Sequence, residues 1–181
     1  TTVVLDGGDN SVTASSGNDT ITAAGGHNTI NAGDGNDTIR LNNGINSVVA
    51  GSGLDRITAA SGSNIINAGD DADTITLTGG YNTVMGGSGN DTITASGGTN
   101  TIATDAGDNT IVLNGGDNSV TASTGNDTLT ANGGNNTINA ADGNDTIRLN
   151  NGTNSVVAGS GLDSITAASG FNIINAGDDA D

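Results

Sequence analysis

Residues 86–94 read GGSGNDTIT, and variants of this nine-residue unit fill the whole chain without insertion or deletion. Counted from Asp6, successive units read DGGDNSVTA, SSGNDTITA, AGGHNTINA and GDGNDTIRL. Every ninth residue from Asn10 to Asp181 is Asn or Asp, and an Ile, Val or Leu stands two positions after each of them from Asn10 to Asn172. A fixed period of this kind indicates a repeat architecture in which each unit packs against its neighbours.

Each unit divides into a turn and a short strand. The turn part, such as GSGND at 87–91, contains the Gly, Asn and Asp that tight turns favour. The strand part, such as TITA at 92–95, contains Thr and Ile, which favour strands, and alternation places Ile and Ala on the face opposite to the threonines. The pattern predicts an all-β fold, a parallel β-roll or β-solenoid with two nonapeptides in each 18-residue coil and about ten coils. Its inward residues would include Ile21, Ala23, Ile39 and Leu41.

A longer repeat overlies the nonapeptides. Residues 8–73 match residues 116–181 at 58 of 66 positions, which is an offset of twelve nonapeptides or six coils. We therefore interpret residues 1–181 as one continuous β-roll segment belonging to a longer repeat array.

Composition excludes several functions. The formal net charge is −17, and Arg40, Arg56 and Arg148 are the only basic residues apart from one histidine. Such a chain is not expected to bind nucleic acid, and no apolar run is long enough for membrane insertion. Cysteine is absent, which excludes disulfides and thiolate metal sites. The single His27 has Asn135 as its counterpart in the second copy of the longer repeat, and no catalytic constellation surrounds it, so we predict that the segment is not an enzyme.

Asp and Asn alternate along the repeat, and two units per coil place them on opposite edges of the predicted roll. The Asp column contains Asp19, Asp37, Asp55, Asp73, Asp91, Asp127, Asp145, Asp163 and Asp181, and Asn109 interrupts it. The Asn column contains Asn10, Asn28, Asn46, Asn64, Asn82, Asn100, Asn118, Asn136, Asn154 and Asn172. Further acids, including Asp34 and Asp70, are expected in loops of the Asp edge.

The two columns predict different chemistry. Asparagine amides both donate and accept, so they can form a structural ladder up the stack. Carboxylates only accept, and at a strand spacing of about 4.8 Å they repel one another unless cations lie between them. With the turn carbonyls they offer hard oxygen ligands, so we predict Ca²⁺ as the cofactor of the Asp edge. The alternative is that these aspartates only cap their own turns.

The units resemble the nonapeptide GGxGxDxUx of the RTX (repeats-in-toxin) family, a calcium-binding parallel β-roll of exported proteins. GGSGNDTIT at 86–94 matches this motif fully and AGDGNDTIR at 32–40 matches closely, and the resemblance covers essentially the whole chain. It implies Ca²⁺ between successive loops, type I secretion, and an extracellular or cell-surface location in a Gram-negative bacterium. The resemblance implies calcium on both edges, whereas the residues support it on one.

The outward strand positions differ between the two faces. After the Asp loops they are mostly threonines, such as Thr92 and Thr94, in an array that resembles the surface of ice-binding β-solenoids; Thr is also simply favoured in exposed strands. After the Asn loops, apolar residues predict a packing surface. This surface contains Val49, Ile65, Met85, Val157 and Ile173, with Ile45, Tyr81 and Phe171 expected in nearby loops.

Together these features predict a structural rod of a secreted bacterial protein, stabilised by calcium on one edge. It would form or extend an extracellular filament, adhesin stalk or surface layer, with self-association end to end or laterally. One alternative is a module that binds ice or a glycan through its Thr array. Another is a set of accessory RTX repeats of a secreted enzyme, which flanking sequence would reveal.

Overall fold

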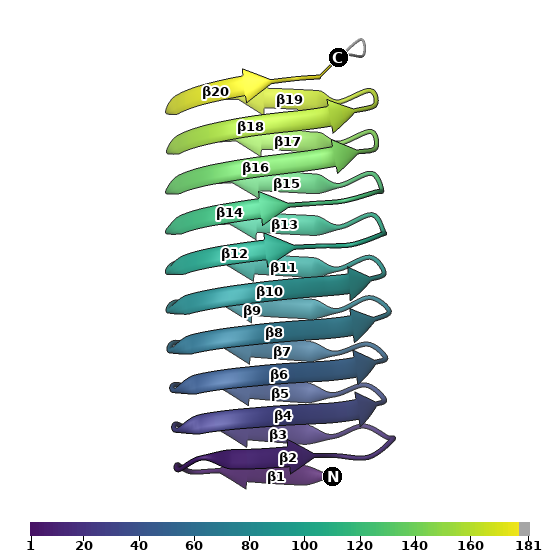
Figure 1. Cartoon of the computed structure of the whole chain (residues 1–181). Coiled ribbons are helices and arrows are strands. Elements are labelled where there is room, and N and C mark those ends of the chain that lie inside the picture. The colour runs from purple at the N-terminus through teal and green to yellow at the C-terminus, as the bar shows by residue number, and fades with distance from the viewer. Residues whose placement is uncertain (178–181) are drawn as a thin grey trace.

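The computed structural model describes residues 1–177 as a flat, elongated stack of β-strands, with the first and last strands at opposite ends (Figure 1). The odd-numbered strands form one ten-stranded sheet, the odd sheet, and the even-numbered strands form a second, the even sheet. The odd sheet contains β1 (Thr2–Leu5), β3 (Thr20–Ala23), β5 (Thr38–Leu41), β7 (Arg56–Ala59), β9 (Thr74–Leu77), β11 (Thr92–Ala95), β13 (Thr110–Leu113), β15 (Thr128–Ala131), β17 (Thr146–Leu149) and β19 (Ser164–Ala167). The even sheet contains β2 (Asn10–Thr13), β4 (His27–Asp34), β6 (Ile45–Ser52), β8 (Ser63–Asp70), β10 (Tyr81–Ser88), β12 (Thr99–Ala103), β14 (Asp117–Thr121), β16 (Asn135–Asp142), β18 (Thr153–Ser160) and β20 (Phe171–Asn175).

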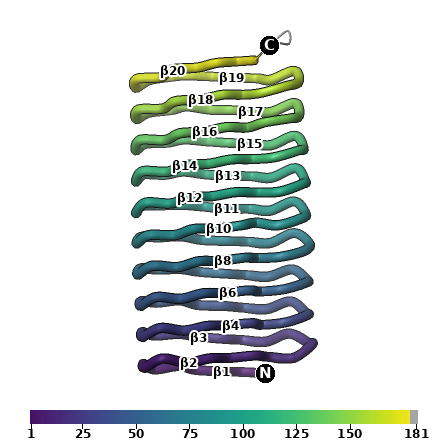
Figure 2. The backbone as a smooth tube through the Cα atoms, in the orientation of Figure 1, coloured from purple at the N-terminus to yellow at the C-terminus, as the bar shows by residue number. Residues whose placement is uncertain are grey.

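Each strand pairs in parallel with the strand one full coil away. Ile21 pairs with Ile39 in the odd sheet, and Asn28 pairs with Asn46 in the even sheet, so the register advances by two nonapeptides per coil. The backbone trace shows the chain passing from one sheet to the other at each edge of the stack (Figure 2). This arrangement confirms the predicted all-β parallel solenoid with two nonapeptides per coil.

The core is a thin aliphatic layer between the two sheets. Ile21, Ala23, Ile39 and Leu41 are fully buried, as the alternation of residues predicts. The even sheet contributes Ile30 and the corresponding residues of the other coils, so similar side chains stack on one another along the rod. Each coil adds few apolar side chains to this layer, and consecutive coils are also joined by the parallel strand ladders.

Strand length differs between the two sheets, which corrects the expectation of uniform four-residue strands. All strands of the odd sheet have four residues, whereas among the described residues six strands of the even sheet have eight. These longer strands continue because Gly33 pairs with Gly51, and Asp34 with Ser52, beyond the buried alanine. Gly33 has a φ of 99°, which glycine adopts without a steric penalty. The glycine lets the strand bend toward the edge while its ladder pairing continues.

Strands β12 and β14 are shorter than their neighbours, with five residues each. Asp105 and Ser123 occupy the bend position that is glycine in β4 and β6, and neither has a positive φ. Because a side chain disfavours the left-handed backbone, these two strands end before the bend. Ala141 takes a φ of 75° at the same position, and β16 keeps its full eight residues.

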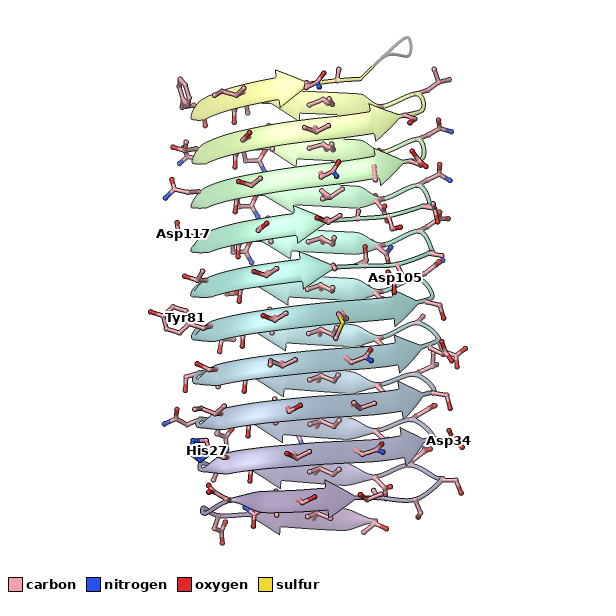
Figure 3. The ribbon with its side chains drawn as sticks, in the orientation of Figure 1. His27, Asp34, Tyr81, Asp105 and Asp117 are labelled. Atoms are coloured by element: carbon pink, nitrogen blue, oxygen red, sulfur yellow. The ribbon has the colours of Figure 1, made fainter. Side chains whose placement is uncertain are left out.

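The outward side chains of the even sheet include several that sequence placed in loops. Ile45, Tyr81 and Phe171 are the first residues of β6, β10 and β20, because from β4 onward the residue before the Asn of the column already pairs in the ladder. Asp34 and Asp70 are the last residues of β4 and β8 rather than loop residues. Figure 3 shows Tyr81 at one edge of the stack and Asp34 at the other.

Candidate metal sites along the aspartate edge

The aspartates of the Asp column lie in one buried row, which defines the Asp edge of the rod. The row contains Asp19, Asp37, Asp55, Asp73, Asp91, Asp127, Asp145 and Asp163, and each of these residues is at most 7% exposed. Asn109 occupies the same row between Asp91 and Asp127 and is 1% exposed. Asp181 lies outside the described residues.

The turn at residues 35–37 shows how the backbone holds one of these side chains. The Gly35 amide donates to the Ser52 carbonyl at 2.7 Å, and the next amide donates to Asn18 Oδ1 at 2.9 Å. The Asp37 amide donates to Asp55 Oδ1 at 2.7 Å. Each carboxylate of the row therefore uses one oxygen to anchor the backbone of the preceding coil rather than to cap its own turn.

The second carboxylate oxygen, Oδ2, has no hydrogen-bond donor in most of the row. It is buried and without a partner in Asp37, Asp55, Asp73, Asp91, Asp127 and Asp145. A buried acceptor that lacks a donor carries a desolvation cost of roughly 1–3 kcal/mol, and more when the group is charged. Repetition of this arrangement along the edge indicates that the row is incomplete without a positively charged partner.

The glycine carbonyls of the Asp-edge turns differ from those of the opposite edge. At the opposite edge, from Ile45 onward, the amide after the turn glycine donates to the glycine carbonyl of the preceding coil, as Ile45 does to Gly26 at 2.9 Å. At the Asp edge the equivalent amide donates to a side chain in several coils, as Leu54 does to Asn36 Oδ1 at 3.0 Å. A Cβ on Gly53 would collide with the glycine carbonyl oxygen of the preceding coil. Stacked glycines thus keep open the space into which these oxygens point.

Burial makes ionisation of the aspartates unfavourable in the metal-free fold. It raises the pKa of Asp73 from 3.8 to about 7, and that of Asp55, Asp91 and Asp145 to about 6. Hydrogen bonds from the amide of the preceding coil oppose this shift only in part, and neighbouring carboxylates add to it. Two ionised neighbours about 4.8 Å apart repel by roughly 3 kcal/mol at an effective dielectric constant of about 20.

The Asn column on the other side, the Asn edge, satisfies its own hydrogen bonds. Each Asn Nδ2 donates to the Oδ1 of the next Asn at 2.7–2.8 Å, from Asn10 to Asn172. The same Nδ2 donates to a carbonyl three residues earlier, as from Asn82 to Gly79 at 3.0 Å. Among the described residues, no asparagine of this column has a buried atom without a partner. The asparagine side chains of the Asn edge therefore leave no buried oxygen without a hydrogen-bond donor, and they need no cation.

The oxygen atoms available as ligands at the Asp edge fit a hard cation that is shared between consecutive turns. Ca²⁺ takes six to eight oxygen ligands, which can include backbone carbonyls as well as carboxylates. Within residues 1–177, no group of three or more His, Cys, Asp or Glu side chains could hold a metal ion. A cation here would therefore need the turn carbonyls in addition to the aspartate oxygens.

Two side-chain features were not predicted from sequence. Asn109 donates from Nδ2 to the Gly107 carbonyl at 2.9 Å, which closes its own turn. At the Asn edge, His27 lies 2.8 Å from Asp9 across one coil, and this hydrogen bond holds the pKa of Asp9 below its usual range. Both side chains of the pair are exposed. For the His27 contact, the spacing of two nonapeptides between the partners was the only signal in the sequence.

Stacked parallel coils define a β-solenoid, and one edge of this solenoid carries a row of buried carboxylate oxygens without hydrogen-bond donors. The model of the RTX calcium-binding nonapeptide repeat matches residues 5–39, 41–75, 76–111, 112–147 and 148–181, and the chain belongs to this family. These nonapeptides are calcium-binding motifs, and the β-roll they form is a structural repeat fold rather than a catalytic one. Neither a curated protein nor a solved structure matches the chain. The part of the chain that the structure describes has no helix long and apolar enough to cross a membrane.

Proposed function

We propose that the chain is a structural rod of a secreted bacterial protein, stabilised by calcium along the Asp edge alone. Family membership indicates a calcium-binding repeat rod, and RTX repeats typically belong to secreted proteins. The observation that carries the proposal is the row of buried Oδ2 atoms without donors, set against an Asn edge that is already satisfied.

Calcium would be held by the aspartate Oδ2 atoms together with carbonyl oxygens of the Asp-edge turns. Its charge would offset the repulsion between stacked carboxylates and would lower their raised pKa values. Because each ion would connect consecutive turns, calcium would add to the free energy of coil stacking. Export through type I secretion from a Gram-negative bacterium, with folding outside the cell where calcium is plentiful, would suit a chain that depends on the ion in this way.

Sedimentation velocity with millimolar calcium and then with a chelator tests the calcium dependence. We expect a compact, elongated particle in calcium and a more expanded chain in chelator, because the carboxylates lose their counter-ions. Magnesium at the same concentration provides the control, since it demands a tighter octahedral site and retains its waters. Identical sedimentation in calcium and in chelator would contradict the proposal.

Rods would assemble into a filament or surface layer by self-association. The outward face of the even sheet exposes Val49, Ile65, Met85, Val157 and Ile173, each at least 42% exposed. Ile45, Ile65 and Tyr81 line a shallow groove on this face. The central outward positions carry no charge in a chain of net charge −17, so a second copy can approach this face without strong repulsion.

Concentration-dependent sedimentation in calcium tests the lateral contact. We expect wild-type protein to associate, and Ile65→Asp to stay monomeric because it places a charge at the centre of the apolar face. Ser119→Asp, three coils along the same sheet and outside this groove, adds the same charge away from the largest side chains and should weaken association less. End-to-end growth alone would leave all three proteins equally associated.

Binding to ice or a glycan is the second candidate, because the odd sheet carries a regular threonine array. Thr74, Thr92 and Thr110 pair in register, and the row continues through Thr128 and Thr146. Stacked hydroxyl and methyl groups about 4.8 Å apart form a flat, repetitive surface. Thermal hysteresis in calcium that disappears in Thr110→Lys would support ice binding, and its absence in wild-type protein would exclude it.

A further inference from the structure

We propose that Asn109 divides the Asp edge into two separate calcium-binding tracks, because its turn is closed by an amide group and has no place for a cation. One track would run from Asp19 to Asp91 and the other from Asp127 to Asp163. The inference rests on the proposed calcium-binding function and specifies where along the rod the ion is excluded.

The backbone continues through the Asn109 turn with the same bonds as in the aspartate turns. Asn109 Oδ1 accepts from the Asp91 amide at 2.9 Å, and the Asn109 amide donates to Asp127 Oδ1 at 2.7 Å. The stacking of coils is therefore not interrupted. Only the second polar atom of the side chain differs, because Nδ2 replaces a carboxylate oxygen.

That one atom changes the balance of donors and acceptors in the turn. Nδ2 donates to the Gly107 carbonyl at 2.9 Å. Asn and Asp have the same shape, and Oδ1 makes the same bond in both, so the Oδ2 of each aspartate stands where this Nδ2 does. By this comparison, the Oδ2 of an aspartate turn would face the glycine carbonyl with no donor between the two oxygens. In the Asn109 turn, the N–H group of Nδ2 satisfies the glycine carbonyl. In the aspartate turns, a cation would be needed to do so.

The coil that contains Asn109 departs from the repeat at two further positions. Thr104 replaces the buried alanine of the even sheet, and Asp105 replaces the glycine at the bend, so β12 ends early. The preceding coil compensates, because Gly86 lacks the Cβ that would collide with Asp91 Oδ2 and crowd the Thr104 methyl group. Thr104 is only 2% exposed, so this is a packed interior arrangement and not a loosened surface turn.

The next aspartate along the stack keeps its anchor to this turn, because the Asn109 backbone amide donates to Asp127 Oδ1 at 2.7 Å. The backbone amide of Asn109 therefore holds the carboxylate at the end of the second track. The coils on either side of Asn109 should remain stacked in chelator after the middle of each track has loosened.

Reciprocal substitutions test the proposal by counting bound ions. Asn109→Asp should bind at least one more calcium per chain than wild-type protein and should be more expanded in chelator. Asp55→Asn should bind at least one fewer and should be more compact in chelator, because its amide can close the turn. Equilibrium dialysis with elemental analysis gives the number of ions, and sedimentation velocity gives the compactness.

Two exposed positions of the same edge provide controls matched in charge. Asn90→Asp adds one negative charge and Asp108→Asn removes one, and in both the side chain keeps the Oδ1 that accepts a backbone amide. Neither should change the number of bound ions. A calcium number in Asn109→Asp equal to that of a calcium-binding wild type would overturn this inference alone. Wild-type protein that binds no calcium would overturn the proposed function, and the division into tracks with it.

Discussion

At both edges of the rod, a column of side chains connects consecutive coils. The side chains differ by one group, which is an NH₂ in Asn and an oxygen in Asp. Both edges repeat once per coil, and both bury an Asn or Asp side chain in nearly every coil. At the Asn edge each amide donates upward to the next amide and inward to its own turn, so the column is complete. At the Asp edge one carboxylate oxygen anchors a backbone amide and the other has no donor.

This difference shows that, within one fold, one edge can stabilise the stack by itself while the other edge would depend on a bound ion. Under the proposed function, the Asn edge would hold the coils together with or without calcium, whereas the Asp edge would hold them fully only when a cation is bound. A rod with two Asn edges would need no ion, and one with two Asp edges would fold only in its presence. The sequence combines both, so calcium should tune the stability of an already specified fold.

The largest effect is expected when a carboxylate is placed in the amide column. Asn82→Asp removes both Nδ2 donor bonds and buries an unpaired charge in the middle of the ladder. We expect a loss of about 3–5 kcal/mol in the free energy of unfolding, as for other uncompensated buried charges. Denaturant titration measures this loss, which should persist in calcium because the turn-glycine carbonyls around Asn82 already accept backbone amides. Rescue of Asn82→Asp by calcium would show that the two edges are interchangeable.

A second comparison places the same methyl group at a turn of each edge. Gly62 and Gly53 both have positive φ, and a Cβ on either would collide with the glycine carbonyl of the preceding coil. Gly62→Ala and Gly53→Ala should each destabilise the rod by about 1–3 kcal/mol through backbone strain. Only Gly53→Ala should also weaken calcium binding, because it displaces a carbonyl of the Asp edge, and isothermal titration calorimetry would measure this. Equal calcium affinity in the two variants would argue against carbonyl ligands.

A change of pH should alter the stability contributed by the Asp edge but not that of the Asn edge, and this effect should be smaller than those of the substitutions above. In chelator, burial raises the folded-state pKa of Asp55, Asp91 and Asp145 to about 6 and that of Asp73 to about 7, above the 3.8 of an ordinary aspartate. A raised folded-state pKa favours the fold when the group is protonated, so this contribution is complete below about pH 3.8 and is lost as the pH rises through 6 to 7. Thermal melts in chelator should therefore give a higher Tm at pH 5 than at pH 8. In calcium the order should reverse, since metal ligands must be deprotonated.

The smallest effect is expected at the exposed pair of the Asn edge. His27→Asn reproduces the counterpart in the second copy of the longer repeat, where Asn135 donates to Asp117 at 2.8 Å. Because the His27 and Asp9 side chains are both largely exposed, we expect no measurable change in Tm at pH 7 and none in calcium binding. A clear shift in either quantity would show that this edge contributes more than its amide ladder.

Much of the fold was predictable because its information is local and repeated. The nonapeptide period fixed the coil length, and the recurrence of residues such as Ile21 and Ala23 fixed the inward positions. Strand length was harder to predict, because the continuation of β4 through Gly33 depends on a backbone conformation rather than on hydrophobic alternation. Tyr81 was placed in a loop for the same reason, since the turn-like composition around it concealed the ladder pairing.

The candidate site was predictable only in part. Segregation of Asp from Asn followed from the period, and with it the membership of the two columns. In Asp37 and its equivalents, one carboxylate oxygen accepts a hydrogen bond and the other does not. This could not be inferred from the sequence, because it depends on which amide of the preceding coil reaches the carboxylate. The self-closing turn of Asn109 likewise needed atomic contacts, although its identity as the exception was evident from the sequence.

The passage of the chain past each edge once per coil constrains how its gene can lengthen. An insertion of one nonapeptide would shift all later units by half a coil, so that carboxylates would continue the amide column and amides the carboxylate column. Insertions of two nonapeptides, or any even number, preserve both columns. The internal duplication has an offset of twelve nonapeptides, which is an even number. Growth of such an array by unequal recombination is thus restricted to whole coils if each edge is to keep its chemistry.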